Sequence, residues 1–191
     1  MPSNADDVEA ALARATREVL EAVVALPGGR VPIVLIDGRS GVGKSTVAAR
    51  LRAQWPGDVS VIGLDELYPG WDGLAEGAEI ARARILEPIA AGRPAVWRRW
   101  DWSRDAPGEE VTTPASHPLI VEGVGVLTPA SSLLAPVRLW LDGPEPSRRD
   151  RALARDGDAY RPHWERWARQ EEEHLRMHRP QASATLRVEV P

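Results

Sequence analysis

Residues 38–45, with the sequence GRSGVGKS, match the pattern G-x-x-x-x-G-K-[ST] of a phosphate-binding loop. Such a loop requires a buried strand before it and a helix after it. The preceding run VPIVLI at residues 31–36 is apolar and rich in β-branched side chains, which is typical of a buried strand, and residues 46–54 read as a helix. The motif therefore restricts the chain to an α/β fold in which this loop follows a central strand.

The loop contains Lys44, the only lysine among the 24 basic residues of the chain. A compact ammonium on a flexible stem reaches between β- and γ-phosphate oxygens, where a planar guanidinium fits poorly. The glycines let backbone N–H groups converge on one anion, and the following helix adds its positive N-terminal end. We therefore expect ATP to be bound by the loop residues Gly38, Arg39, Ser40, Gly41, Val42, Gly43, Lys44, Ser45 and Thr46.

The composition excludes several classes of protein. With 191 residues and a formal net charge of -4, the chain suits one domain without a basic surface for nucleic acid. No uncharged apolar run approaches the roughly 18 residues that cross a membrane. Cysteine is absent, which excludes disulfides and thiolate metal sites, and the first residues lack a secretory signal pattern. We expect a cytoplasmic protein, and the sequence leaves open whether it forms a homo-oligomer.

Strand and helix patterns alternate along the chain. Residues 3–26 repeat apolar positions every three or four residues and predict an amphipathic helix. Further strands are predicted at 59–64, 118–122, 137–142 and 184–190, and helices at 76–91 and 144–178. Alternation of this kind implies right-handed crossovers and a parallel sheet whose ligand site lies at the carboxyl ends of the strands. The predicted fold is a three-layer α/β/α domain over residues 1–191 with a five-stranded parallel sheet.

Two segments are expected to cover the phosphate loop. Residues 95–113 contain three tryptophans, mixed charge and a Pro-Gly pair at 107 and 108, which predicts a hairpin with its turn there. We place this hairpin in a small substrate flap over about residues 66–113. The strongly charged helical stretch is expected to supply a lid over about residues 144–165.

Two acids end predicted strands and so lie on the phosphate side of the sheet. Asp65 is placed to accept the proton of a substrate hydroxyl or to hold Mg²⁺ through water, although a turn-capping role is the alternative. Glu122 is placed to bind Mg²⁺ through water, and a solvent-facing strand end is its alternative. With the Ser45 hydroxyl, the predicted Mg²⁺ ligands are Ser45, Asp65 and Glu122.

The order of these motifs resembles that of the uridine/cytidine kinase group of P-loop kinases, which includes phosphoribulokinase and bacterial pantothenate kinase. The resemblance covers roughly residues 31–190 and rests on the loop, on DELY at 65–68, on RWDW at 99–102 and on IVEG at 120–123. It also includes LWLD at 139–142 and the arginine series RRDRALARD at 148–156. The resemblance implies a P-loop NTPase fold and an ATP- and Mg²⁺-dependent small-molecule kinase.

The resemblance also implies roles for individual residues. Asp65 resembles the general base, Tyr68 and Trp100 an aromatic wall, and Asp101 a carboxylate that holds sugar hydroxyls. Where the family has His and Arg after that aspartate, this chain has SRDAP at 103–107, which leaves Arg104 as the candidate; Trp71 adds a second flat ring suited to stacking on a base. The lid arginines that would close over the phosphates are Arg148, Arg151 and Arg155, which share one helical face.

A nucleoside is the favoured acceptor, and other acceptors stay open: pantothenate, a sugar phosphate or an antibiotic hydroxyl. An alternative of another class is a regulatory P-loop protein that switches partners with its bound nucleotide. A guanine-reading Asn-Lys-x-Asp element is impossible here because Lys44 is already used. A mechanical ATPase is disfavoured because Gly123, and not a second acid, follows Glu122.

Overall fold

The computed structural model describes residues 4–29 and 31–191. The parallel strands are β1 (Ile33–Gly38), β2 (Ser60–Gly63), β5 (Leu119–Glu122), β6 (Val137–Asp142) and β7 (Leu186–Glu189), and the antiparallel hairpin consists of β3 (Ala95–Asp101) and β4 (Ala106–Thr113). The helices are α1 (Asn4–Val24), α2 (Lys44–Gln54), α3 (Leu74–Ile80), α4 (Glu87–Ala90), α5 (Pro129–Ser132), α6 (Glu145–Tyr160), α7 (Trp164–His178) and α8 (Pro180–Ser183). Three shorter segments are the 3₁₀ turns η1 (Leu64–Glu66) and η3 (Arg161–His163) and the π-helical η2 (Ala81–Leu86).

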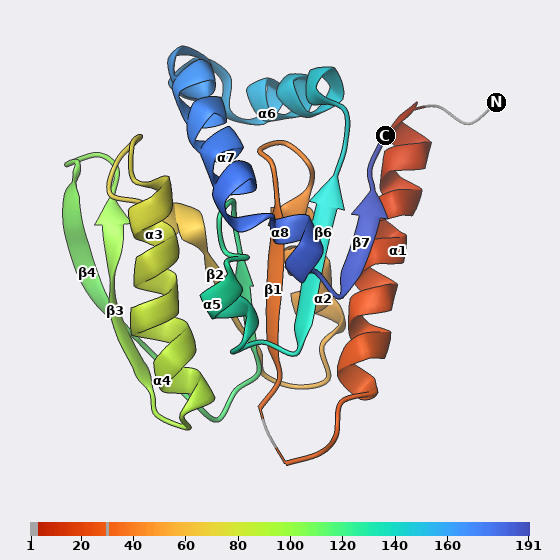
Figure 1. The fold of residues 1–191 in the computed structure, drawn as a ribbon, viewed down its shortest axis with the longest axis vertical. Helices are drawn as coiled ribbons and strands as arrows, with labels where there is room; N and C mark the ends of the chain where they lie inside the picture. Colours follow the sequence, from red (N-terminus) through yellow and green to blue (C-terminus); the bar gives the residue numbers. More distant parts are fainter. Residues whose placement is uncertain (1–3, 30) are drawn as a thin grey trace.

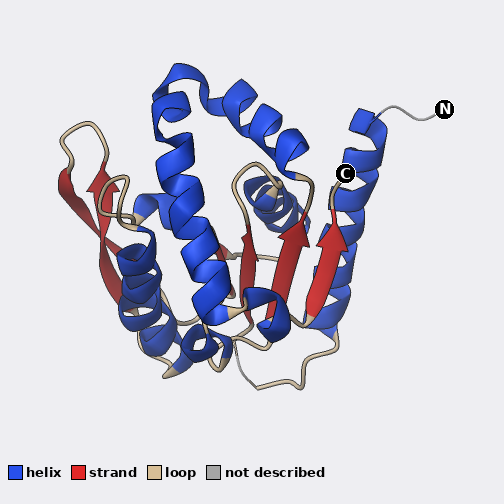
Figure 2. Cartoon of the chain, turned by 45° about the horizontal axis from the view of Figure 1, so that its top comes forward, coloured by secondary structure: helices blue, strands red, loops and turns tan. Residues whose placement is uncertain are grey.

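The five-stranded sheet has the order β2-β5-β1-β6-β7, and every neighbouring pair is parallel (Figure 1). The predicted three-layer α/β/α fold with five parallel strands is therefore confirmed. Strand β1 lies at the centre, between β5 and β6, so the loop that follows it emerges at the middle of the carboxyl edge. Figures 1 and 2 show α6 lying beyond that edge of the sheet and α7 running from there down one face of the sheet.

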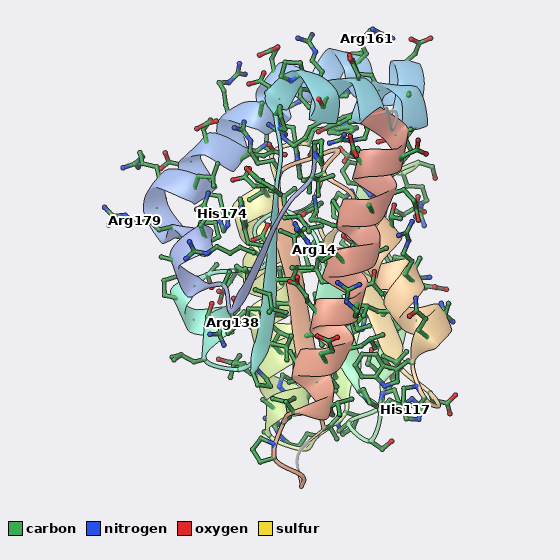
Figure 3. All side chains as sticks on the ribbon, turned by 90° about the vertical axis from the view of Figure 1, so that its right-hand side faces the viewer. Arg14, His117, Arg138, Arg161, His174 and Arg179 are labelled. Carbon is green, nitrogen blue, oxygen red and sulfur yellow. The ribbon has the colours of Figure 1, made fainter. Side chains whose placement is uncertain are left out.

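Apolar side chains on both faces of the sheet create two cores. On one face, Val34 and Ile36 of β1 pack with residues of α1 and α2, including Ala15, Val19 and Leu51. On the other face, Ile33 and Leu35 pack with the α3–α4 segment and with Trp164 and Trp167 of α7. This alternation explains the continuous apolar run in β1, because a strand buried on both faces needs apolar side chains on both. Figure 3 shows the layers from the side, with Arg14 of α1 and His174 of α7 on opposite sides of the sheet.

The predicted strands and helices occur in the predicted order, and most bounds differ from the observed ones by no more than two residues. The helical stretch predicted over 144–178 is interrupted, because Gly157 has a non-helical backbone and the 3₁₀ turn η3 separates α6 from α7. Residue 3, predicted as the first residue of the N-terminal helix, lies outside the described residues. The predicted helix over 76–91 begins earlier, at Leu74, and contains the π-helical segment η2. The prediction of a hairpin turn at Pro107 and Gly108 is wrong: both residues are in β4, and the chain turns between Asp101 and Ala106.

The true hairpin turn is stabilised by a carboxylate. Oδ1 of Asp101 accepts hydrogen bonds from the backbone N–H groups of Ser103 (3.0 Å) and Arg104 (3.2 Å), and Asp105 adopts a positive φ of 48°. Aspartate is favoured in such turns because its side chain bonds to the backbone two residues ahead. The Pro-Gly pair at 107 and 108 is also a common turn sequence, and the sequence alone does not show that the turn forms at Asp101 instead. This explains the error in the predicted turn.

None of the described helices is both long enough and sufficiently apolar to cross a membrane.

Candidate functional site

A cavity of about 590 Å³ lies at the carboxyl ends of the parallel strands. Three strand ends contribute to its wall: Lys44 and Ser45 come from the loop after β1, Asp65 follows β2, and Glu122 ends β5. Helices α6 and α7 close the cavity from the other side, through Arg155, Asp156, Ala159, Tyr160 and Trp167. Residues of the phosphate loop therefore lie in one cavity with the two acids predicted to function with it.

The conformation of the phosphate loop is set by buried contacts on both sides. Asp37, fully buried at the end of β1, accepts hydrogen bonds from the N–H groups of Gly38 (2.7 Å), Gly125 (3.1 Å) and Leu127 (2.8 Å). Gly41 has φ of 78°, and a Cβ atom there would lie 1.9 Å from the backbone oxygen of Arg148 in α6. A residue with a side chain therefore cannot replace Gly41 without moving α6 away from the loop.

Lys44 is buried and points into the loop. Its Nζ donates a hydrogen bond of 3.2 Å to the backbone oxygen of Arg39. Burial lowers the pKa of Lys44, and the nearby carboxylates of Glu122 and Glu171 oppose that shift. The ammonium is therefore held inside the loop by a weak contact that a phosphate oxygen is able to replace.

The two predicted acids face each other across Gly63. A Cβ atom on Gly63 would lie 2.3 Å from Oδ1 of Asp65, so a side chain there would displace the Asp65 carboxylate, and it would lie 3.5 Å from Oε1 of Glu122, which is an ordinary contact distance. Burial raises the pKa of Asp65, and the charge of Glu66 raises it further. Burial also raises the pKa of Glu122, partly opposed by Lys44 and Ser45. A raised pKa strengthens a carboxylate as a proton acceptor, which suits a general base.

The three residues predicted to hold Mg²⁺ line the same cavity. The Ser45 hydroxyl donates a 2.8 Å hydrogen bond to Oε1 of Glu122, and Asp65 lines the same cavity. Among the described residues, no cluster of three or more His, Cys, Asp or Glu suited to a metal occurs. This set fits Mg²⁺, which commonly uses one or two protein oxygens together with substrate phosphates and water and does not require a cage of protein ligands.

The three predicted lid arginines have different surroundings. Arg148 is 2% exposed, and its guanidinium donates to the backbone oxygens of Gly143 (2.9 Å) and Ser40 (3.0 Å). Arg151 donates to the oxygens of Gly41 (2.9 Å) and Pro191 (2.6 Å). Arg155 lines the cavity and forms two hydrogen bonds with its neighbour Asp156. Of the three, only Arg155 lines the cavity, because Arg148 and Arg151 bind carbonyl groups of the loop.

Five aromatic rings form a wall of the same cavity, which we call the aromatic wall. Its rings belong to Tyr68, Trp71, Trp102, Tyr160 and Trp167. The ring of Trp71 stacks on His163, with a centroid distance of 4.2 Å and an interplanar angle of 11°, and its centroid lies 5.1 Å from that of Trp102. The hydroxyl of Tyr68 donates to the backbone oxygen of Val124 (2.7 Å). The predicted residues Tyr68 and Trp71 are therefore in the cavity.

The other three predicted acceptor residues lie elsewhere. Trp100 lines a second cavity of about 480 Å³, between the β3–β4 hairpin and the helix that begins with α3. Asp101 holds the hairpin turn, where the Ser103 hydroxyl donates to Oδ1 (2.6 Å) and, as the largest cause, lowers the pKa of Asp101. Arg104 does not line the large cavity. A bulge between Arg98 and Trp100 changes the alternation of β3, and this irregularity is not visible in the sequence pattern.

Sequence reasoning missed several residues that line the cavity, including one acidic and three aromatic side chains. Trp102 was recognised only as part of a tryptophan-rich segment, yet its Nε1 donates to the backbone oxygen of Asp65 (2.7 Å). Asp156, Tyr160 and Trp167 come from the lid and the helix after it. Trp164, Trp167, Glu171 and His174 form the buried face of α7, and of these only Trp167 lines the cavity, which their helical spacing alone does not show.

No protein-family model and no curated protein matches this chain. Solved structures do match its fold. A possible uridine kinase from Bacillus stearothermophilus has a TM-score of 0.68 at 16% sequence identity, over 92% of this chain and 98% of that one. A candidate fructose transport system kinase from Silicibacter sp. TM1040 has a TM-score of 0.54 at 24% identity, over 94% of this chain and 98% of the other. At these identities the likeness concerns the fold, and the chain has the three-layer α/β/α fold of P-loop kinases.

Proposed function

We propose that this protein is an ATP-dependent kinase that transfers the γ-phosphate to a hydroxyl group of a small molecule. The observation that carries this proposal is the meeting of Lys44, Ser45, Asp65 and Glu122 in one cavity that the aromatic wall also lines. A nucleotide switch has no need of a buried carboxylate with a raised pKa beside an organic binding surface. A kinase needs both, because it must position an acceptor and take a proton from it.

The chemistry assigned to the residues is an in-line transfer. The acceptor hydroxyl oxygen forms a bond to the γ-phosphorus, the bond from that phosphorus to the bridging oxygen breaks, and ADP leaves with that oxygen. Asp65 accepts the hydroxyl proton, and Lys44 stabilises the charge on the phosphates. Bound Mg²⁺, held through Ser45 and Glu122 with Asp65 nearby, would neutralise further phosphate charge.

The three arginines of α6 are assigned two different roles. Arg155 lies in the cavity and is assigned to the transferred phosphate, for which it would exchange its contact with Asp156. Arg148 and Arg151 are assigned to bracing the loop, since their donors meet the carbonyl oxygens of Ser40 and Gly41. Helix α6 thus serves as a lid that also shapes the phosphate site.

A nucleoside is the acceptor that we favour. The flat rings of the aromatic wall suit stacking on a base, and the resemblance to uridine and cytidine kinases supports the same acceptor. The flap then consists of the segment from η1 to the β3–β4 hairpin, which brings Tyr68, Trp71 and Trp102 to the cavity. Pantothenate, a sugar phosphate and an antibiotic hydroxyl remain the competing acceptors.

An acceptor panel tests the function. Purified protein with Mg²⁺ and ATP is incubated with nucleosides, pantothenate, sugar phosphates or hydroxyl-bearing antibiotics, and ADP release is followed. ADP release that depends on one acceptor class supports the kinase and identifies its substrate. Equal ADP release with and without every acceptor would contradict the kinase and favour the nucleotide switch.

Two tryptophans of the hairpin provide a matched pair for the acceptor wall. Trp102 is 39% exposed and lines the large cavity, whereas Trp100 lines the second one. We expect Trp102→Ala to raise the acceptor KM by a factor that corresponds to about 1–3 kcal/mol, the usual range for a base stacked on an aromatic ring. Trp100→Ala should leave this KM within about twofold, since a side chain away from the acceptor contributes no binding energy to it.

Steady-state kinetics with the acceptor found in the panel measures both effects. Trp102→Phe separates stacking from the hydrogen bond to Asp65, because phenylalanine keeps a ring and lacks the indole N–H. It should retain most of the acceptor affinity. A larger effect of Trp100→Ala than of Trp102→Ala would place the acceptor in the second cavity.

The carboxylate of Asp101 offers a separate test of ribose recognition. Because it is engaged by Ser103 and Arg104 in the hairpin turn, Asp101→Ala should change the KM of a ribonucleoside and of its 2′-deoxy analogue by the same factor. Parallel kinetics with the two acceptors checks this. A selective loss for the ribonucleoside would show that the hairpin moves to bring Asp101 onto the sugar.

A further inference from the structure

Glu171 is a buried carboxylate to which the proposed reaction assigns no role. It lies on α7, is 2% exposed, and contacts the phosphate loop, which precedes it by more than 120 residues. Its Oε2 accepts a hydrogen bond from Nε of Arg39 (3.0 Å), and its Oε1 accepts one from the backbone N–H of Ser40 (2.9 Å). The next residue, Glu172, also pairs with Arg39 (2.6 Å) but is 63% exposed.

The two ends of one peptide group are held by opposite charges. The N–H of Ser40 and the carbonyl of Arg39 belong to the same planar peptide unit and point in opposite directions. Glu171 accepts from the N–H, and the Lys44 ammonium donates to the carbonyl oxygen (3.2 Å). Each contact polarises the peptide in the sense that strengthens the other. Rotation of the peptide by half a turn would break both contacts and direct the carbonyl oxygen at the Glu171 carboxylate.

The helix that carries Glu171 is anchored by its other side chains. The neighbouring Gln170 donates to the backbone oxygen of Trp71 (2.7 Å) and accepts from the N–H of Leu74 (3.2 Å). Trp164 and Trp167 bury the same face of α7 in the core. Figure 1 shows α7 running beside the loop that follows β1. Because α7 is anchored independently of the phosphate loop, the Glu171 carboxylate has a fixed position and is able to set the conformation of the loop.

We propose that Glu171 is a positioning residue of the phosphate loop. Its carboxylate fixes the Arg39–Ser40 peptide so that the Arg39 carbonyl faces Lys44 and leaves the phosphate pocket to donors alone. If the Arg39 carbonyl oxygen turned into that pocket, it would repel the phosphate oxygens. Lys44 would also lose its hydrogen bond to this oxygen, which keeps the ammonium inside the loop. The inference rests on the proposed function only in that the loop binds a nucleoside triphosphate.

Two substitutions separate the reach of this side chain from its charge. Glu171→Gln keeps the length and an oxygen that accepts from the Ser40 N–H but removes the charge. Glu171→Asp keeps the charge but withdraws the carboxylate by one methylene from that N–H. We expect Glu171→Gln to bind Mg·ATP within about threefold of the unmodified protein and Glu171→Asp to bind about tenfold or more weakly, because the hydrogen bond to the Ser40 N–H persists without its charge in the first variant and is lost in the second.

Glu172→Ala is the matched control, because it removes the exposed partner of the same arginine from the same helix. It should leave the affinity within about twofold, as expected for an exposed pair. Isothermal calorimetry with Mg·ATP and no acceptor measures all the affinities, and thermal unfolding confirms that each variant is folded. Failure of the kinase assignment stays distinguishable, because it would appear as normal Mg·ATP binding without turnover on any acceptor.

A double-mutant cycle with Lys44 distinguishes the proposed positioning role from a purely structural one, for which the effects of the two substitutions on Mg·ATP affinity should be additive. If Glu171 acts through the peptide that Lys44 contacts, Glu171→Asp should weaken binding much less in a Lys44→Ala background than alone, because coupled residues are not additive. The proposal is overturned if Glu171→Asp binds like the unmodified protein, if Glu171→Gln loses affinity as strongly as Glu171→Asp, or if the two substitutions are additive.

Discussion

Lys44→Ala should lower phosphoryl transfer by at least about 100- to 1,000-fold, the usual loss when one preorganised group that stabilises developing charge is removed. The buried ammonium also stabilises the charge of Glu122, so its loss would remove one of the positive charges that compensate this carboxylate in the cavity. ATP affinity should fall more than ADP affinity, because the side chain reaches the γ-phosphate. Acceptor-dependent ADP release measures the rate, and calorimetry measures the two affinities.

Lys44→Arg is the control for charge alone. It should restore little activity, since the guanidinium is broad and planar and the site of the lysine is enclosed by the loop. Equal losses of ATP and ADP affinity in Lys44→Ala would show that the lysine does not reach the γ-phosphate. Full activity of Lys44→Arg would show that the site has more room than its burial indicates.

Asp65→Asn should lower kcat by about 100-fold or more and leave ATP affinity nearly unchanged, as expected when a positioned general base is lost. The amide has almost the shape of the carboxylate, and the fold should survive. Burial raises the pKa of Asp65, so the folded protein binds this proton more tightly than the unfolded chain does. Stability contributed by this residue is therefore lost as the pH rises through the ordinary and then the raised pKa, and asparagine should not reduce stability at neutral pH.

The pH profile provides a second measurement on the same residue. A base must be deprotonated to act, so activity should be lost as the pH falls through the raised pKa of Asp65, at a higher pH than an exposed aspartate would give. This acidic limb should disappear from the residual activity of Asp65→Asn. If it persists there, Glu122, whose pKa burial also raises, is the titrating group. Full turnover by Asp65→Asn would assign the base to Glu66 or Glu122.

Local sequence patterns determined the parts of this protein that depend on neighbouring residues in the chain. The apolar run of β1, the glycines of the loop and the start of α2 form one continuous segment, and their order alone predicts a phosphate site. Asp65 and Glu122 were located for a related reason, because parallel strands end at a common edge of the sheet. The five-stranded parallel sheet was predicted in the same way.

Tertiary structure decided which side chains of the covering segments reach that site. Trp100 and Trp102 are two positions apart, yet a bulge in β3 and a turn held by Asp101 direct them to different cavities. Likewise, Arg148 and Arg155 are on one helix, yet only Arg155 lines the cavity. Arg148 donates a hydrogen bond to the backbone oxygen of Ser40 because α6 approaches the loop closely at Gly41. Periodicity shows which residues share a face of an element, but where that face lies depends on packing between distant segments, and a local pattern contains no record of that packing.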